Sequence, residues 1–401
     1  SNDFYLTNPV ADGDTLFRGV DDDTYITALT LDMSAAGAAT FNAGATFGGK
    51  ILLSDNGNTT IAGLQLGNAG IGISVPTTDQ MNFITADVSR FVIAADGSLS
   101  TPTAGTSNVR FGVNAGNLIA SGGNYNVFVG DEAGTATSTG DNNTAVGYAA
   151  LATEDGNGSN TAIGWSTLKN LNAGAEGYNT AVGYDAGRNV TTGLKNTLIG
   201  SFAGNYTSTA DSSTFIGYNA GLGISGTQLT GDDNTAVGRN TGALLQGAAN
   251  SNTLVGAYAG DALTTGSNNV AVGFESLSTE DAHGNNIAIG NRALKTLNAG
   301  AAGLNVAIGD DAGLAMTSGI QNTLVGGLAG DALEDADANV AIGKGALTTD
   351  RLGSYSVAVG FAALEAQIFT SATNSYNTAV GAAAGASVST GTNNTLIGGL
   401  S

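Results

Sequence analysis

From residue 108 onward, apolar and polar positions follow a five-residue motif. The motif is Asn or Ser, then Thr, Val or Ile, then a variable residue, an apolar residue and Gly, as in NTAVG at 143. A repeat kept over about 290 residues predicts a solenoid rather than separate globular domains. With a modal spacing of 17 residues, the seventeen copies start at 108, 126, 143, 160, 179, 196, 213, 234, 252, 269, 286, 305, 322, 339, 356, 377 and 394.

Each motif predicts a short β-strand, because it is rich in β-branched residues and a coil is too short for two helices. Since side chains alternate along a strand, positions two and four share one face and position three takes the other. Position three is apolar in every copy except Arg110, which indicates that both faces are covered. Because a solenoid has one interior, position three is predicted to meet other subunits of a homotrimer. The predicted interface residues are Ala145, Ala162, Ala181, Leu198, Phe215, Ala236, Leu254, Ala271, Ala288, Ala307 and Leu324.

Position two forms a column of threonines in the earlier copies, which resembles an ice-binding ladder. The same position holds Val or Ile in later copies, for example Val270 and Ile287. This exchange favours a column that faces the interior of the coil. The threonines lie at 144, 161, 180, 197, 214, 235 and 253.

Position five is Gly in all copies, where the chain must leave the strand through a turn unsuited to a Cβ atom. A second stretch, such as RNVTTG at 188, predicts two short strands and two turns per coil of a parallel β-roll. Seventeen coils at ~4.8 Å each make a rod of about 80 Å. The structural turn glycines are Gly147, Gly164, Gly183, Gly200, Gly217, Gly238, Gly256, Gly273, Gly290, Gly309, Gly326, Gly343, Gly360, Gly381 and Gly398.

A longer repeat is superimposed on the coils. TEDGNGSNTAIG at 153 recurs as TEDAHGNNIAIG at 279, which is 126 residues later. LKNLNAGAEGYNTAVG at 168 recurs at 294 with the same displacement. These matches indicate that a block of about seven coils was duplicated.

The first hundred residues lack the motif and predict a separate region of small β elements. TYITALTLDMSAAGAATFNAGATFGG alternates Thr with apolar residues, and MNFITADVSRFVIAADGSLSTP has the pattern of a hairpin followed by a turn. We therefore divide the chain into an N-terminal β-rich segment, residues 1–104, and a repetitive β-roll, residues 105–401. The boundary is placed within residues 102–106.

Composition narrows the classes of partner. The 401 residues include 62 Gly and no Cys, and the formal net charge is −21. This charge disfavours nucleic acid and anionic membrane surfaces as partners, because both require clustered Lys and Arg. No run approaches the ~18 apolar residues of a membrane span. The absence of an initial Met suggests a processed or partial product.

Candidate catalytic groups are sparse, and no catalytic residue, cofactor or metal site is predicted. Glu154 with Asp155 and Glu280 with Asp281 are the best carboxylate pairs, but they occupy equivalent places in the duplicated block and are expected to be surface turns. The only histidine, His283, is expected to be exposed. Asp21, Asp22 and Asp23 are expected to form a solvated turn, with calcium binding as the alternative.

Several aromatic residues directly follow a motif glycine. They could stack on sugar rings, but packing against neighbouring coils is the favoured interpretation. They are Tyr148, Trp165, Tyr184, Tyr218, Phe274 and Phe361.

The coils resemble the β-roll head repeats of trimeric autotransporter adhesins, whose Asn-Ser-Val-Ala-Ile-Gly motif is close to NNVAVG at 268 and NNIAIG at 285. ITALTLDMSAAGAATFN and MNFITADVSRFVIAADGSL resemble segments of marine bacteriophage tail fibres. This resemblance implies a homotrimeric virion fibre that contacts other tail proteins and a host surface glycan or receptor. It also implies that a C-terminal chaperone could be cleaved off after Ser401.

The alternatives are a bacterial trimeric surface adhesin and a polysaccharide-degrading tailspike. For the preferred non-enzymatic fibre, the longer coils are the candidate surfaces for contact, while the receptor residues stay open. These coils contain residues 219–233, 362–376, 171–178 and 297–304.

Overall fold

The computed structural model describes the solenoid completely and the N-terminal region in part. No helix occurs in the described residues, which form an all-β structure. They are residues 15–21, 24–32, 38–41, 64–65, 72–77, 80–85, 88–93 and 99–401.

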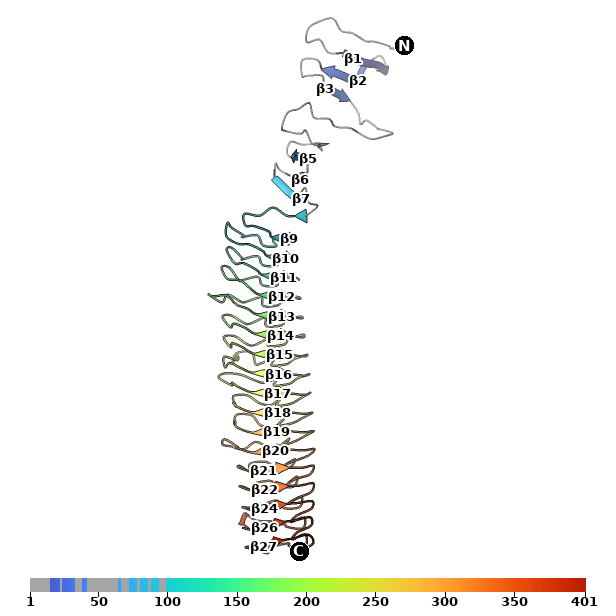
Figure 1. Cartoon of the computed structure of the whole chain (residues 1–401). Coiled ribbons are helices and arrows are strands. Elements are labelled where there is room, and N and C mark those ends of the chain that lie inside the picture. Colours follow the sequence, from blue (N-terminus) through green and yellow to red (C-terminus); the bar gives the residue numbers. More distant parts are fainter. Residues whose placement is uncertain are drawn as a thin grey trace.

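Two antiparallel sheets precede the solenoid (Figure 1). The hairpin predicted in MNFITADVSRFVI is confirmed, because Phe83 pairs with Phe91 across its two strands. Of the Asp21–Asp23 run, Asp21 ends a strand, while Asp22 and Asp23 lie outside the described residues. The first sheet contains β1 (Thr15–Asp21), β2 (Thr24–Asp32) and β3 (Ala38–Phe41); the second contains β4 (Leu64–Gln65), β5 (Gly72–Thr77), β6 (Gln80–Thr85), β7 (Val88–Ile93) and β8 (Leu99–Ser100).

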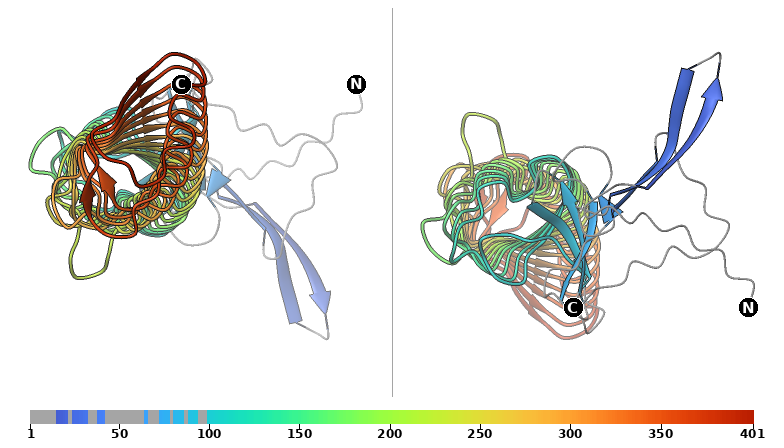
Figure 2. Two further views of the ribbon diagram at one scale, coloured as in Figure 1. Left: turned by 90° about the horizontal axis from the view of Figure 1, so that it is seen from below. Right: turned by 90° about the horizontal axis from the view of Figure 1, so that it is seen from above.

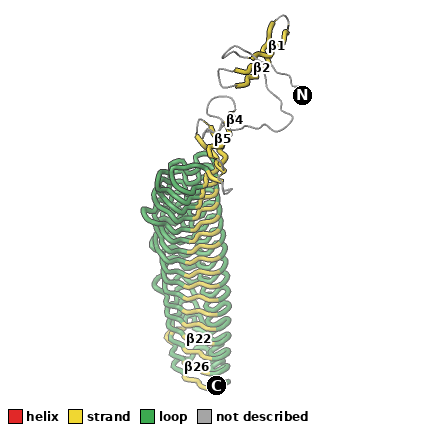
Figure 3. Tube along the Cα trace, turned by 45° about the horizontal axis from the view of Figure 1, so that its top comes forward, coloured by secondary structure: helices red, strands yellow, loops and turns green. Residues whose placement is uncertain are grey.

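The solenoid has seventeen coils, and each coil contributes one three-residue strand to a parallel sheet. Each strand pairs in register with the strand of the next coil, as Ala145 does with Ala162. The strands lie above one another along one side of the rod (Figures 1 and 3). They are β9 (Val109–Phe111), β10 (Val127–Val129), β11 (Thr144–Val146), β12 (Thr161–Ile163), β13 (Thr180–Val182), β14 (Thr197–Ile199), β15 (Thr214–Ile216), β16 (Thr235–Val237), β17 (Thr253–Val255), β18 (Val270–Val272), β19 (Ile287–Ile289), β20 (Val306–Ile308), β21 (Thr323–Val325), β22 (Val340–Ile342), β24 (Val357–Val359), β26 (Thr378–Val380) and β27 (Thr395–Ile397).

The predicted second strand of each coil is wrong for most coils. After the motif, alternate residues have positive φ, for example Gly183 at 141°, Asp185 at 53° and Gly187 at 58°. A strand requires negative φ at every residue, so this segment forms a series of turns. The turns still donate main-chain hydrogen bonds to neighbouring coils. Only β23 (Gly353–Ser354) and β25 (Thr373–Asn374) form a second strand pair in the solenoid.

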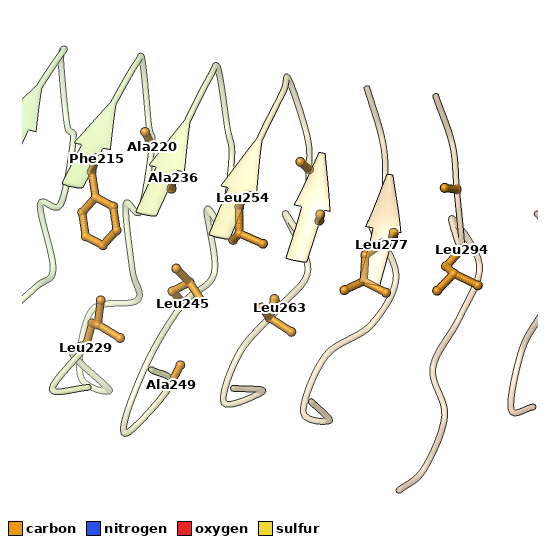
Figure 4. Close-up of a cluster of buried hydrophobic side chains, with 14 of the residues drawn as sticks. Phe215, Ala220, Leu229, Ala236, Leu245, Ala249, Leu254, Leu263, Leu277 and Leu294 are labelled. Atoms are coloured by element: carbon orange, nitrogen blue, oxygen red, sulfur yellow. The ribbon is translucent and has the colours of Figure 1, made fainter. Parts of the chain in front are cut away.

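The predicted interface column is instead the interior of the coil. All eleven residues have no exposed surface within a single chain, so no second subunit can contact them. In Figure 4, Phe215 and Leu254 point from their strands toward leucines on the opposite wall, including Leu245 and Leu263. The corrected set is Ala145, Ala162, Ala181, Leu198, Phe215, Ala236, Leu254, Ala271, Ala288, Ala307 and Leu324.

The interior follows a rule of complementary size. Where the third motif residue is Ala, as at Ala145, a leucine commonly stands six residues later, here Leu151. Where the third residue is Phe or Leu, the residue six later is Gly wherever that residue exists. A Cβ on Gly134 would lie 2.4 Å from the Phe128 ring, so the coil has room for one large side chain at this level.

The motif asparagines form a buried ladder inside the rod. The side chain of Asn126 accepts a hydrogen bond from the main-chain N–H of Asn143 at 2.8 Å and donates one to the Gly140 carbonyl at 2.8 Å. Its own N–H donates to the Asn108 side chain at 2.8 Å. Most of these amides therefore fasten their own coil to the next and close the turn that leads into it, while Asn160 and Asn286 donate to their own turns instead.

The turn glycines are confirmed as a column that requires the absence of a Cβ. Their φ values lie between 122° at Gly398 and 147° at Gly309. Each glycine before the last also lies close to the carbonyl group of the corresponding glycine in the following coil.

The first coil is closed by polar groups. Arg110 occupies the interior position that is apolar elsewhere, and its Nε donates to the Ala115 carbonyl at 2.6 Å. The predicted boundary segment is bound to this coil, since Thr101 accepts the N–H of Arg110 and Thr103 accepts from the Asn108 side chain. A polar cap of this kind is expected at the end of a solenoid.

Candidate functional site

The outward surface of the seventeen strands is a continuous uncharged face, made of Thr, Val and Ile side chains beside an uninterrupted apolar column. It consists of motif positions two and four, and we call it the strand face. Because position three points inward, the threonine column points outward, which corrects its predicted inward placement; Thr144 and Thr161 are half-buried in the single chain. Position four is entirely apolar, and Ile163, Ile308 and Ile342 each keep 38 to 39% of their surface exposed.

The strand face carries no charged residue at either position in any coil. Its two columns are ~7 Å apart and run the length of a rod of about 80 Å. Contiguous apolar surface of this extent is unusual on a soluble monomer and marks an interaction site.

The predicted surface location of the acidic pairs is wrong for Glu154 and Glu280, which are completely buried, while Asp155 is exposed and Asp281 half-buried. The Glu154 carboxylate accepts main-chain N–H bonds from Asn157 at 3.2 Å and Ala173 at 3.3 Å. Glu280 likewise accepts from His283 and Ala299. Each glutamate therefore closes one turn and holds the insertion of the next coil, where no substrate can reach it.

His283 is half-buried rather than exposed as predicted, and its Nδ1 lies 3.1 Å from Glu280 Oε1. Together with Asp281 these residues place three potential metal-ligand atoms within 4.8 Å of one another. The two main-chain bonds and the imidazole contact already explain the position of the Glu280 carboxylate.

Four carboxyl groups of the solenoid share a pKa raised chiefly by burial, namely those of Glu154, Asp185, Asp261 and Asp331. A pKa higher in the folded than in the unfolded chain means that the folded state binds protons more readily, so stability falls as pH rises through the folded pKa. The net charge of −21 adds self-repulsion at neutral pH. We expect the melting temperature to be higher at pH 5 than at pH 7.5. Thermal unfolding followed by circular dichroism measures this difference.

Asp261→Asn provides the matched variant, because Asp261 Oδ1 is buried without a hydrogen-bond partner. The variant should show a smaller difference between the two pH values than the wild type. A wild-type melting temperature that decreases from pH 7.5 to pH 5 would contradict the assignment.

The aromatic residues that follow the motif glycines pack against one another along the rod, in agreement with the favoured interpretation. Tyr148 stacks on Trp165 with ring centroids 5.9 Å apart, and Trp165 stacks on Tyr184 at 4.8 Å. Phe202 continues the row by an edge contact with Tyr184 at 5.3 Å and another with Tyr218. The rings remain partly exposed, with Tyr184 at 45%. They form an aromatic row across five consecutive coils, and Phe274 and Phe361 lie apart from it.

A groove of about 420 Å³ lies beside this row and spans three coils. Its wall contains Asp185, Arg188, Asn189, Phe202, Asn205 and Tyr206. Its edge is formed by Asn219 and Leu222, which belong to one of the longer coils predicted as contact surfaces.

The other three longer coils project exposed residues, including Glu176, Ala301 and Glu365, without lining this groove. The five-residue motif did not reveal the groove, because the groove residues stand six, nine and ten positions after the start of the motif in three successive coils.

In the described part of the chain, no helix has the length and apolarity needed to cross a bilayer. The chain matches no protein-family model, no curated protein and no solved structure.

Proposed function

We propose that this chain is a structural fibre of a virion, of the tail-fibre kind, which acts in host attachment or spacing without catalysis. The observation that carries the proposal is the strand face, an uncharged surface mainly of Thr, Val and Ile whose fourth-position column is apolar along the whole solenoid. A rod that must stay soluble has to cover such a surface, and an identical copy offers the same surface in the same register. Three copies that bury their strand faces around a common axis would make a stiff homotrimeric fibre.

The interface in this proposal differs from the one expected from the sequence. Motif positions two and four supply it, while position three fills the coil. Thr, Val and Ile at positions two and four suit close packing between sheets, because β-branched side chains are short and stiff. Subunit number rests on the resemblance to trimeric adhesin heads, since two or six copies could cover the same face.

The mechanical role of the rod follows from the contacts that repeat between successive coils. Every coil presents a main-chain edge, a buried Asn or Ser and a turn glycine to the next coil, so the rod lengthens without a cofactor. Repeated surface features on three subunits also favour attachment by many weak contacts, whose avidity exceeds their single affinities.

A bacterial trimeric surface adhesin is the alternative that shares this architecture. It requires a membrane anchor in the full-length protein, whereas the virion fibre requires a domain that attaches to the particle. A polysaccharide-degrading tailspike receives less support, because the glutamates of the two best carboxylate pairs are buried and bound to main-chain amides.

The native mass in solution, measured by light scattering, tests the assembly. We expect a value near three times the 39.4 kDa of the chain. Val255→Lys combined with Val272→Lys places two charges on the strand face and should yield the single-chain mass with an unchanged circular dichroism spectrum. Thr265→Lys, on an exposed turn, is the control and should keep the mass of the wild type.

A wild-type monomer would overturn the proposed fibre. A wild-type dimer or hexamer would retain the strand face as the interface and contradict the trimer. An assembly that survives both lysine substitutions would show that another surface holds the subunits together.

A further inference from the structure

The groove beside the aromatic row combines polar and aromatic groups in a single concavity. Arg188, Asn189 and Asn205 supply hydrogen-bond donors, while Phe202 and Tyr206 supply aromatic surface. The volume of about 420 Å³ falls within the range of small-ligand sites. Each of these five residues is at least partly buried, so their side chains have restricted freedom before any ligand arrives.

The polar groups of the groove are held in a chain of hydrogen bonds. The Asn189 side chain donates to Asn205 Oδ1 at 3.0 Å, and Asn205 donates to the Asp185 carbonyl at 2.9 Å. Asp185 is only 5% exposed, and its Oδ1 has no hydrogen-bond partner. Its Oδ2 lies 3.5 Å from Arg188, a distance that leaves the ion pair loose. This Oδ1 has no surface accessible from the groove, so the hydrogen-bonding groups offered to a ligand are the Arg188 guanidinium and the Asn189 amide.

The duplicated block shows that the coil architecture does not require these side chains. At a displacement of 126 residues, Asp185 corresponds to Asp311, but the other groove residues are replaced. Asn189 becomes Ala315, and Tyr206 becomes Ala332. The remaining replacements are Leu314 for Arg188, Leu328 for Phe202 and Asp331 for Asn205.

The aspartate itself has a different environment in the second block. Asp311 is bound by Arg292 at 2.5 Å, and Arg292 stands where the first block has Ser166. Ser166 Oγ is buried without a hydrogen-bond partner, and so are Asp185 Oδ1 in the first block and Asp311 Oδ1 in the second. The first block therefore has no guanidinium at the position of Arg292. It carries amides and aromatic rings near its aspartate instead.

We propose that this groove binds a neutral oligosaccharide, with one sugar ring against Phe202 and Tyr206 and its hydroxyls bonded to Arg188 and Asn189. The biological meaning of this site rests on the proposed attachment function. Planar guanidinium and amide groups can bond to adjacent hydroxyls, and an aromatic ring packs on the apolar C–H face of a sugar. Asp185 and Arg188 balance one another in charge, and the chain's net charge of −21 opposes polyanionic ligands.

Trp165 provides a reporter for binding, because it is the only tryptophan and the Arg188 guanidinium lies 5.8 Å from its ring centroid. We would titrate the full chain with trisaccharides of glucose, galactose, mannose and N-acetylglucosamine. Tryptophan fluorescence and saturation-transfer NMR would be read in parallel. At least one neutral trisaccharide should shift the emission and receive saturation.

The test variant is Asn189→Ala with Tyr206→Ala, which introduces the residues that the second block already accommodates. It should weaken binding at least tenfold while keeping the wild-type spectrum and native mass. Ala315→Asn with Ala332→Tyr makes the reverse exchange in the second block and should leave binding unchanged.

Absence of binding by every neutral trisaccharide would overturn the inference, as would equal binding by the Asn189→Ala, Tyr206→Ala variant. Preferential binding of a sialylated or uronate-containing trisaccharide would overturn the assignment of a neutral ligand. The native mass separates this result from the proposed fibre: a trimer that binds no sugar refutes the groove alone, and a monomer that binds sugar refutes the fibre alone.

Discussion

Gly273→Ala is expected to destabilise the solenoid by about 3–5 kcal/mol, among the largest effects available to a single methyl group. Gly273 has a φ of 137°, a region that residues with a Cβ rarely adopt. A Cβ would also lie 2.2 Å from the carbonyl oxygen of Gly290 in the next coil. Main chain cannot move aside as a flexible side chain would, so the two coils must separate and lose hydrogen bonds. Amide hydrogen exchange of the flanking coils, together with chemical unfolding, measures the loss.

Two other glycines allow the two causes of this loss, the positive φ and the close carbonyl oxygen, to be measured separately. Gly398 has a φ of 122° but no heavy atom within 4 Å of its added Cβ, so Gly398→Ala should show the backbone cost alone, about 1–2 kcal/mol. Gly327 meets only ordinary contact, at 3.8 Å, and Gly327→Ala should be nearly neutral. If Gly273→Ala cost no more than Gly398→Ala, close stacking of the coils would not be the reason for this column.

The repeat, the strands and the turn glycines could be predicted because each depends on local sequence. The coil boundaries follow from a motif in which Gly never varies, and the strands from β-branched residues at positions two and four. The two faces could not be assigned in the same way. Position three is apolar in all but one coil, and positions two and four combine Thr with apolar residues, so alternation alone does not say which face lies inside.

The identity of the inward face was nevertheless present in the sequence, in a relation between two positions of the same coil. Phe128 is followed six residues later by Gly134, whereas Ala145 is followed by Leu151. Such compensation of volume is expected only between side chains that share one enclosed space. Comparison of position three with the residue six later would therefore have identified the interior.

The buried glutamates and the groove were beyond prediction for a different reason. Glu154 accepts a hydrogen bond from Ala173, which belongs to an insertion in the following coil, and nothing in the spacing of the two residues indicates that contact. The groove residues occupy the same offsets in three successive coils, but the residue types at these offsets change from coil to coil. The divergence between the duplicated blocks, as at Asn189 and Tyr206, is the sequence feature that distinguishes them.

Asn322→Ala is the second substitution for which we expect a large loss, about 2–5 kcal/mol. The Asn322 side chain is fully buried, accepts the N–H of Asn339 at 3.0 Å and donates to the Ala336 carbonyl at 2.7 Å. Alanine would leave a buried N–H and a buried carbonyl without these partners. Chemical unfolding gives the loss in free energy, and hydrogen exchange at the Asn339 amide reports it locally. Asn291→Ala, which removes an exposed side chain, is the control and should change stability by less than about 0.5 kcal/mol.

The chain itself contains an intermediate case that sharpens this prediction. Ser213 takes the place of the asparagine in one coil, where its N–H still donates to Asn196 Oδ1 at 2.9 Å and its hydroxyl accepts from Asn234 N at 3.3 Å. A serine thus keeps a longer version of the bond between coils, but its short side chain does not supply the amide that closes the next turn. Asn322→Ser should therefore cost less than Asn322→Ala. Equal losses for the two variants would mean that closure of the turn, rather than the bond between coils, provides the stabilisation.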